Sequence, residues 1–134
     1  MRVDGLIITG HSVDVYDPDV ISSSMGSFFN VPFIRFSEKN NIDGYIAKLR
    51  DKFSELKIIG TTAHSQKHIY EIDLKTPSLF FIGNETDGLN QHLCEICDCL
   101  ITIPMSKNSS ASSFNVSCAA TVMFYETFRQ RLHF

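Results

Sequence analysis

Apolar residues follow two alternating periods along the chain. Short unbroken runs rich in Ile, Leu and Phe predict β-strands that are buried on both faces, over residues 6–9, 31–36, 56–60, 78–82 and 100–104. Apolar residues that recur every three or four positions predict helices between and after them, over 19–29, 42–53, 89–96 and 113–131. The segment 64–70 is predicted to be a loop or an irregular helix.

This alternation predicts an α/β fold with a mostly parallel sheet and helices on both of its faces. The 134 residues show no linker, repeat or shift in composition, so we expect a single domain over residues 1–134. Parallel sheets bind ligands at the carboxyl ends of their strands. Three turns follow predicted strands, and we expect them to meet at one site: Gly60-Thr61-Thr62-Ala63, Gly83-Asn84-Glu85 and Pro104-Met105-Ser106.

Composition and charge narrow the class of protein. A hydrophobic content of 43% predicts a globular core, and the formal charge of -3 argues against a broadly basic surface. The basic residues in the middle of the chain are interpreted as a solvated helix face, with contact to phosphate as the alternative: Lys48, Arg50, Lys52, Lys57 and Lys67. The apolar runs are too short to span a bilayer and the N-terminus has no apolar signal region, which favours a cytoplasmic protein without membrane contact.

The cysteines and histidines indicate no metal site. Cys94, Cys97 and Cys99 lie within six residues and are predicted to be buried thiols. Together with Cys118 they are expected to be free thiols in a reducing compartment. His64 and His68 have a spacing that could serve a metal. They are interpreted instead as part of a solvated segment.

The first candidate site is the segment Gly83-Asn84-Glu85 with Gly88. Glycine lets the backbone approach a ligand closely, and the carboxylate of Glu85 could bind a hydroxyl or an ammonium group. An ordinary turn after a strand explains the same residues equally well.

The second candidate site is "IPMSKNSSASSFNVSCAA", Ile103 to Ala120. A strand leads into a polar loop, and the loop leads into a helix whose start carries Ser112, Ser113 and Asn115. One of these side chains is enough to cap the helix, which would leave Asn115 and a serine for a ligand at the positive end of the helix dipole. A solvated serine loop is the alternative.

Together the two segments resemble the SpoU/TrmH family of RNA methyltransferases in the SPOUT superfamily. "GNETDG", residues 83–88, is similar to the family motif "GNEGxG". "IPM" at 103–105 and "SFNVSCAA" at 113–120 are similar to its closing motifs "IPM" and "SLNVSxAAA". "SSMGSFFNVP" at 23–32 looks like its "ASxGxxFxxP" stretch, so the resemblance covers nearly the whole chain.

The resemblance implies a function and a fold. Family members transfer a methyl group from S-adenosylmethionine to a ribose 2'-hydroxyl of tRNA or rRNA, and three loops of a trefoil knot line their cofactor pocket. It implies cofactor binding by Thr61, Thr62, Ala63, Gly83, Asn84, Gly88, Ile103, Pro104, Met105, Phe114 and Val116. It implies that Glu85, Ser113 and Asn115 orient the reacting groups, and that Gly83 leaves room for the cofactor.

Two further expectations concern the ends of the domain. Family members begin with a motif like "NxGxxxRxxxxxG", whereas this chain starts at Met1-Arg2-Val3-Asp4-Gly5, where that motif would be ending. This departure predicts an N-terminally shortened domain, and it makes a non-catalytic module for cofactor binding, RNA binding or dimerisation the alternative function.

The last helix carries more apolar side chains than one face buries, which favours a homodimer through Phe114, Val122, Phe124, Tyr125 and Phe128.

Overall fold

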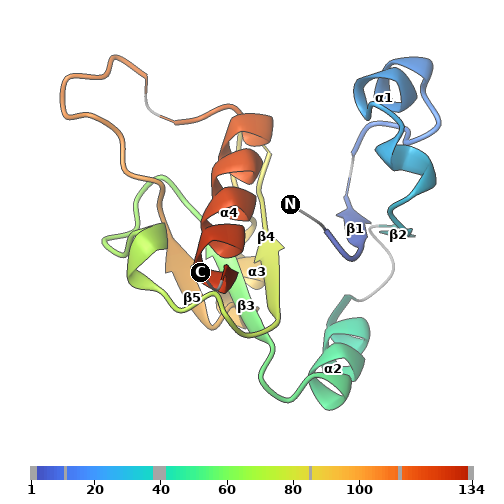
Figure 1. Cartoon of the computed structure of the whole chain (residues 1–134), viewed down its shortest axis with the longest axis horizontal. Coiled ribbons are helices and arrows are strands. Elements are labelled where there is room, and N and C mark those ends of the chain that lie inside the picture. Colours follow the sequence, from blue (N-terminus) through green and yellow to red (C-terminus); the bar gives the residue numbers. More distant parts are fainter. Residues whose placement is uncertain (1–2, 11, 38–41, 85, 112, 133–134) are drawn as a thin grey trace. The chain divides into compact units, whose positions relative to one another are not determined.

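The computed structural model describes residues 3–10, 12–37, 42–84, 86–111 and 113–132 of the chain (Figure 1). The chain divides into two compact units, one over residues 2–51 and a larger one over residues 52–134. Each unit has a parallel sheet of its own, with two strands in the smaller unit and three in the larger.

The smaller unit is built on a parallel pair of strands. β1 (Leu6–Thr9) lies beside β2 (Phe33–Phe36), with Leu6 opposite Phe33. The connection contains α1 (Pro18–Ser23) and the short 3-10 helix η1 (Ser27–Phe29), and α2 (Ile42–Lys52) follows the second strand. The guanidinium of Arg35 fixes the loop after β1, because it donates to the carbonyls of Ser12 at 2.9 Å and Val13 at 3.1 Å.

The prediction of one continuous helix over residues 19–29 is wrong. The helix stops at Ser24, since Met25 has a φ of 50° and Gly26 has a φ of 84°. Helical backbone requires negative φ, so two successive left-handed residues break the chain into α1 and η1. The apolar spacing in this segment comes from a cluster of aromatic rings, in which Phe28 packs against Tyr16 and Phe33.

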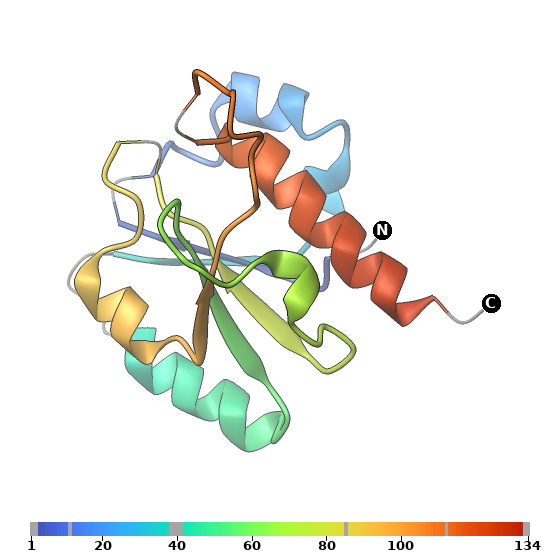
Figure 2. The same cartoon turned by 90° about the vertical axis from the view of Figure 1, so that its left-hand side faces the viewer.

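The larger unit places three parallel strands side by side. β3 (Lys57–Thr61) is central, with β4 (Ser78–Phe81) on one side and β5 (Cys99–Ile101) on the other. The other elements are η2 (Ile69–Glu71), α3 (Gln91–Ile96) and α4 (Val116–Arg131). In Figure 1, α4 crosses in front of this sheet and α3 lies behind it, and the turned view in Figure 2 agrees. The α/β class with parallel strands and helices on both faces is thus confirmed for this unit.

The core of the larger unit lies between the sheet and α4. Ile59 of β3, Ile101 of β5 and Met123 of α4 are fully buried, and the segment after η2 adds Leu74. On the opposite face Gly60 lets α3 approach, because a Cβ at this position would lie 2.7 Å from the Sγ atom of Cys97. Each face of the sheet is therefore packed by its own helix.

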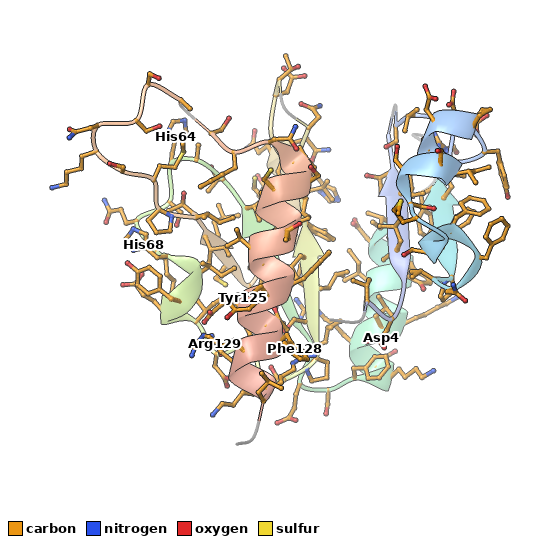
Figure 3. All side chains as sticks on the ribbon, turned by 45° about the horizontal axis from the view of Figure 1, so that its top comes forward. Asp4, His64, His68, Tyr125, Phe128 and Arg129 are labelled. Carbon is orange, nitrogen blue, oxygen red and sulfur yellow. The ribbon has the colours of Figure 1, made fainter. Side chains whose placement is uncertain are left out.

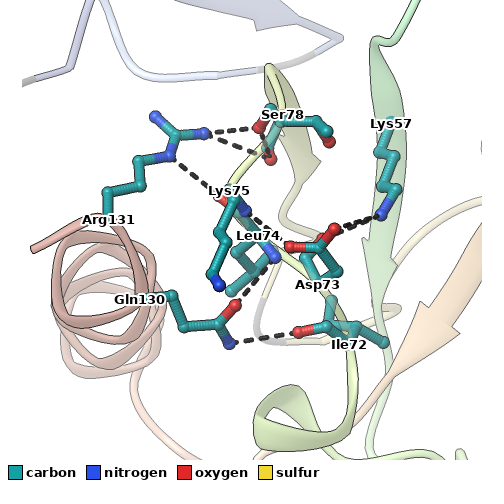
Figure 4. A network of polar contacts seen from close by, with 9 residues as sticks. Lys57, Ile72, Asp73, Leu74, Lys75, Ser78, Gln130 and Arg131 are labelled. Carbon is teal, nitrogen blue, oxygen red and sulfur yellow. Dashed lines mark hydrogen bonds and ion pairs between the residues drawn. The ribbon is translucent and has the colours of Figure 1, made fainter. Parts of the chain in front are cut away.

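The C-terminal turn of α4 is hydrogen-bonded to the segment between η2 and β4 (Figure 4). Gln130 accepts from the backbone N–H of Leu74 at 2.9 Å and donates to the carbonyl of Ile72 at 3.1 Å. Arg131 donates to the carbonyls of Leu74 at 2.8 Å and Thr76 at 2.6 Å. These bonds satisfy backbone groups of a segment that forms no strand, which fixes its Ile72 and Leu74 side chains in the core.

We expect Gln130→Ala to lower the free energy of unfolding by about 1 to 3 kcal/mol, because it leaves partly buried backbone groups of Ile72 and Leu74 without partners. Urea unfolding measures the change. The matched control is Gln91→Ala on α3, which removes only an exposed bond to Glu95 and should cost less than about 0.5 kcal/mol. Equal losses for the two variants would contradict a structural role for Gln130.

Candidate functional site

A cavity of about 630 Å³ opens at the carboxyl edge of the three-stranded sheet. Its walls are the segments that follow β3, β4 and β5, together with the start of α4. The three turns singled out from the sequence therefore meet at one site. All eleven residues predicted to bind a cofactor line it: Thr61, Thr62, Ala63, Gly83, Asn84, Gly88, Ile103, Pro104, Met105, Phe114 and Val116.

The segment after β3 is fixed to both neighbouring strands. The hydroxyl of Thr61 donates to the carbonyl of Phe81 at 3.1 Å, at the end of β4. The backbone N–H of Thr62 donates to the carbonyl of Ile101 at 2.9 Å, at the end of β5. These two bonds extend the pairing of the sheet into the wall of the cavity, so the backbone there is held in place before any ligand binds.

The segment after β4 closes on itself around Asn84. The side-chain oxygen of Asn84 accepts from the backbone N–H groups of Thr86 at 3.0 Å and Asp87 at 2.6 Å, and its carbonyl accepts from Gly88 at 3.2 Å. This is the pattern of an Asx turn. Glu85 lies outside the described residues, so its predicted catalytic role stays a prediction.

Gly83 and Gly88 of this segment favour glycine for different physical reasons. A Cβ on Gly83 would lie 2.2 Å from the carbonyl carbon of Gly88, so Gly83 is required for the loop to close on itself. The sequence-based expectation was that Gly83 leaves room for a ligand. Gly88 is the residue with open space beside it, since a Cβ there would meet no atom within 4 Å, and its φ of 68° favours glycine.

The start of α4 differs from the prediction. The helix begins at Val116 rather than at Ser113, and Asn115 is its N-cap. The side-chain oxygen of Asn115 accepts from the backbone N–H of Ser117 at 2.9 Å and from its hydroxyl at 2.6 Å. The expectation that Asn115 leaves capping to a serine is therefore wrong. Ser113 lines the cavity, whereas Asn115 shapes the wall between Phe114 and Val116.

Sequence reasoning missed two histidines of the cavity. His64 and His68 belong to the lining of the cavity, although their spacing in the sequence was interpreted as that of a solvated segment (Figure 3). The side chain of His64 is exposed and that of His68 is half-buried. Their spacing of four residues does not reveal that they line a cavity. A bridge between the backbones of His68 and Thr102 brings this segment to the end of β5, and this pairing is distant in sequence.

The four cysteines form no disulfide. All four cysteines are free. Cys94, Cys97 and Cys99 are half-buried rather than buried as predicted, and Cys118, in the first turn of α4, is exposed. Burial raises the pKa of Cys97 to about 11, so this thiol is protonated at neutral pH and a weak nucleophile.

The described residues contain no cluster of three His, Cys, Asp or Glu side chains able to bind a metal ion. No helix in that part of the chain is both long and apolar enough for a membrane span.

Comparison with known proteins identifies the class to which this fold and cavity belong. The model of the SpoU rRNA Methylase family matches residues 1–125. The 23S rRNA (uridine(2479)-2'-O)-methyltransferase of Streptomyces viridochromogenes is 38% identical over 128 residues, which cover 96% of this chain and 44% of that protein. The 23S rRNA (guanosine-2'-O-)-methyltransferase RlmB of Pseudomonas aeruginosa is 36% identical over 88 residues, which cover 64% of this chain and 35% of that protein.

Solved structures agree with the sequence comparison. The crystal structure of the SpoU methyltransferase AviRb from Streptomyces viridochromogenes, in complex with the cofactor AdoMet, matches with a TM-score of 0.86 at 38% identity. The match covers 95% of this chain and 49% of that chain. The chain belongs to the SpoU rRNA methylase family, and it spans less than half the length of these relatives.

We expect Gly83→Ala to lower the free energy of unfolding by about 1 to 3 kcal/mol, because the new methyl group collides with the backbone of Gly88. The matched control is Gly44→Ala in the first turn of α2, where a Cβ meets open space. That change should stabilise the chain by up to about 1 kcal/mol through helix propensity. Urea unfolding compares the two, and effects of the same sign would show that the loop tolerates a side chain at position 83.

Proposed function

We propose that residues 1–134 form the S-adenosylmethionine-binding domain of an RNA methyltransferase that modifies a ribose 2'-hydroxyl of tRNA or rRNA. The observation that carries this proposal is the cavity formed where the segments after β3, β4 and β5 meet the start of α4. Membership of the SpoU family supports it, and so does the likeness to AviRb, whose crystal structure contains AdoMet.

The cavity fits a ligand of this kind. Its volume of about 630 Å³ lies within the range of roughly 300 to 1,000 Å³ that is typical of small-molecule sites. Apolar side chains such as Ile103, Met105 and Phe114 suit an adenine ring, while Thr61, Thr62 and Asn84 bring polar groups. The open space beside Gly88 allows close approach to the backbone. When bound, the cofactor supplies a methyl group on a positively charged sulfur.

The contribution of this chain to catalysis would be mainly positioning. A protonated ribose hydroxyl is a poor nucleophile, so it must be aligned with the methyl group and assisted in losing its proton. Ser113 brings a hydroxyl to the cavity that can orient the ribose. Asn115 acts on the site through the helix cap, and Glu85 is proposed to complete the set of orienting groups.

Three finer features belong to the same proposal. We propose that the chain passes through a trefoil knot, as the family resemblance implies. We propose a homodimer through α4, where Tyr125 and Phe128 are 57% and 42% exposed (Figure 3). A cytoplasmic location fits four cysteines that all remain free thiols.

Calorimetry with S-adenosylmethionine tests the cofactor site directly. The unchanged chain should bind the cofactor, and Asn115→Ala should weaken binding by about fivefold, because loss of a helix cap costs about 1 kcal/mol and here loosens a wall of the cavity. The matched control is Asp17→Ala, which removes the same type of cap from α1, a bond of 2.8 Å to the backbone N–H of Asp19. Asp17 does not line the cavity, so this variant should bind the cofactor normally. No heat of binding with the unchanged chain would remove the proposed function.

A transfer assay separates an enzyme from the non-catalytic alternative. We expect labelled methyl groups from the cofactor to appear in RNA as alkali-resistant dinucleotides, because a methylated 2'-oxygen cannot attack the neighbouring phosphate. Bulk tRNA and rRNA are the substrates, and RNA without protein is the control. Label in alkali-sensitive mononucleotides would contradict ribose methylation. Cofactor binding without any transfer would favour a cofactor-binding or dimerisation module.

A further inference from the structure

A stacked pair of rings lies beside the cavity, on the segment that joins β3 to β4. The rings of His68 and Tyr70 have centroids 5.2 Å apart and planes only 7° from parallel. His68 belongs to the lining of the cavity, while Tyr70 is 57% exposed. The pair therefore joins a ring of the cavity lining to a ring that is exposed to solvent.

The backbone holds this pair rigidly against β5. Thr102 donates to the carbonyl of Lys67 at 2.8 Å, and Ile69 donates to the carbonyl of Thr102 at 3.1 Å. Ser65 adds a bond of 2.8 Å from its hydroxyl to the carbonyl of Leu100. Ile69, between the two rings in sequence, is only 4% exposed and belongs to the core. A ligand that contacts the pair would meet a surface that is already ordered.

Glu71 fixes the orientation of the His68 ring. Its carboxylate accepts from the backbone N–H of His68 at 2.6 Å and lies 3.1 Å from the Nδ1 atom of the ring. The backbone hydrogen bond lowers the pKa of Glu71, so the carboxylate is ionised at neutral pH and can only accept. The proton of a neutral His68 is therefore on Nδ1.

We propose that His68 and Tyr70 form a stacking surface for an unpaired base of the RNA, next to the ribose that is methylated. This inference rests on the proposed function and specifies which part of the protein contacts the RNA strand. Nucleobases stack on aromatic side chains with little dependence on sequence, and single-stranded RNA is commonly bound in this way. Lys67, exposed on the same segment, is placed to neutralise a phosphate of the same strand.

Fluorescence anisotropy with a labelled, mixed-sequence, single-stranded 20-nucleotide RNA and the full chain tests the proposal. Tyr70→Leu keeps an apolar side chain but removes the aromatic face, so the dissociation constant should rise by about 5- to 150-fold with an unchanged dependence on salt. Tyr70→Phe retains the ring and should bind within about twofold of the unchanged chain. Lys67→Ala should reduce the salt slope by about 0.7, whereas the control Lys75→Ala, on the segment before β4, should not change it.

Calorimetry with S-adenosylmethionine on the same variants separates this inference from the proposed function. Tyr70→Leu should bind the cofactor as the unchanged chain does. Unchanged RNA affinity in Tyr70→Leu would overturn the stacking surface while leaving cofactor binding intact, and so would failure of the unchanged chain to bind the RNA. Equal weakening of RNA and cofactor binding would show that the rings only support the loop. Failure of the unchanged chain to bind the cofactor would instead count against the proposed function.

Discussion

Parallel pairing of β3 with both of its neighbours is the constraint on which the site depends. Gly60 lies opposite Phe81 of β4, and Thr61 lies opposite Ile101 of β5, so the three strands end within one residue of each other. Segments that are about twenty residues apart in sequence therefore leave the sheet at the same edge. The hydrogen bonds from Thr61 and Thr62 continue this pairing beyond the strands, which turns three separate loops into walls of one cavity.

The polar side chains of these walls serve mainly to shape the backbone. The Asn84 oxygen holds the turn after β4, and the Asn115 oxygen caps α4. The same amide side chain thus appears twice for one physical reason: its oxygen can accept from backbone N–H groups two or three residues further along. A ligand in the cavity would then meet backbone groups and apolar side chains whose positions are set in advance, which reduces the entropy lost on binding.

Several features could be predicted from the sequence because they depend on local patterns. Unbroken apolar runs gave the strands, and glycine or polar residues after them gave the turns that meet at the cavity. Other features depend on backbone angles or on distant contacts. The positive φ of Met25 divides a segment whose apolar spacing suits one helix, and the start of α4 is set by which residue becomes its N-cap. The position of His68 depends on pairing with Thr102, 34 residues further along, which no local pattern reveals.

The order of the elements also decides which unit of the chain forms the cavity. The described lining runs from Thr61 to Ala119, so the cavity is built entirely within the larger unit. The proposed cofactor site is therefore formed by one sheet and its loops. The stacked rings belong to the connection from β3 to β4, whose first residues line the cavity and which is fixed to the end of β5 by its own hydrogen bonds. The same connection therefore carries the first wall of the cavity and the proposed stacking pair.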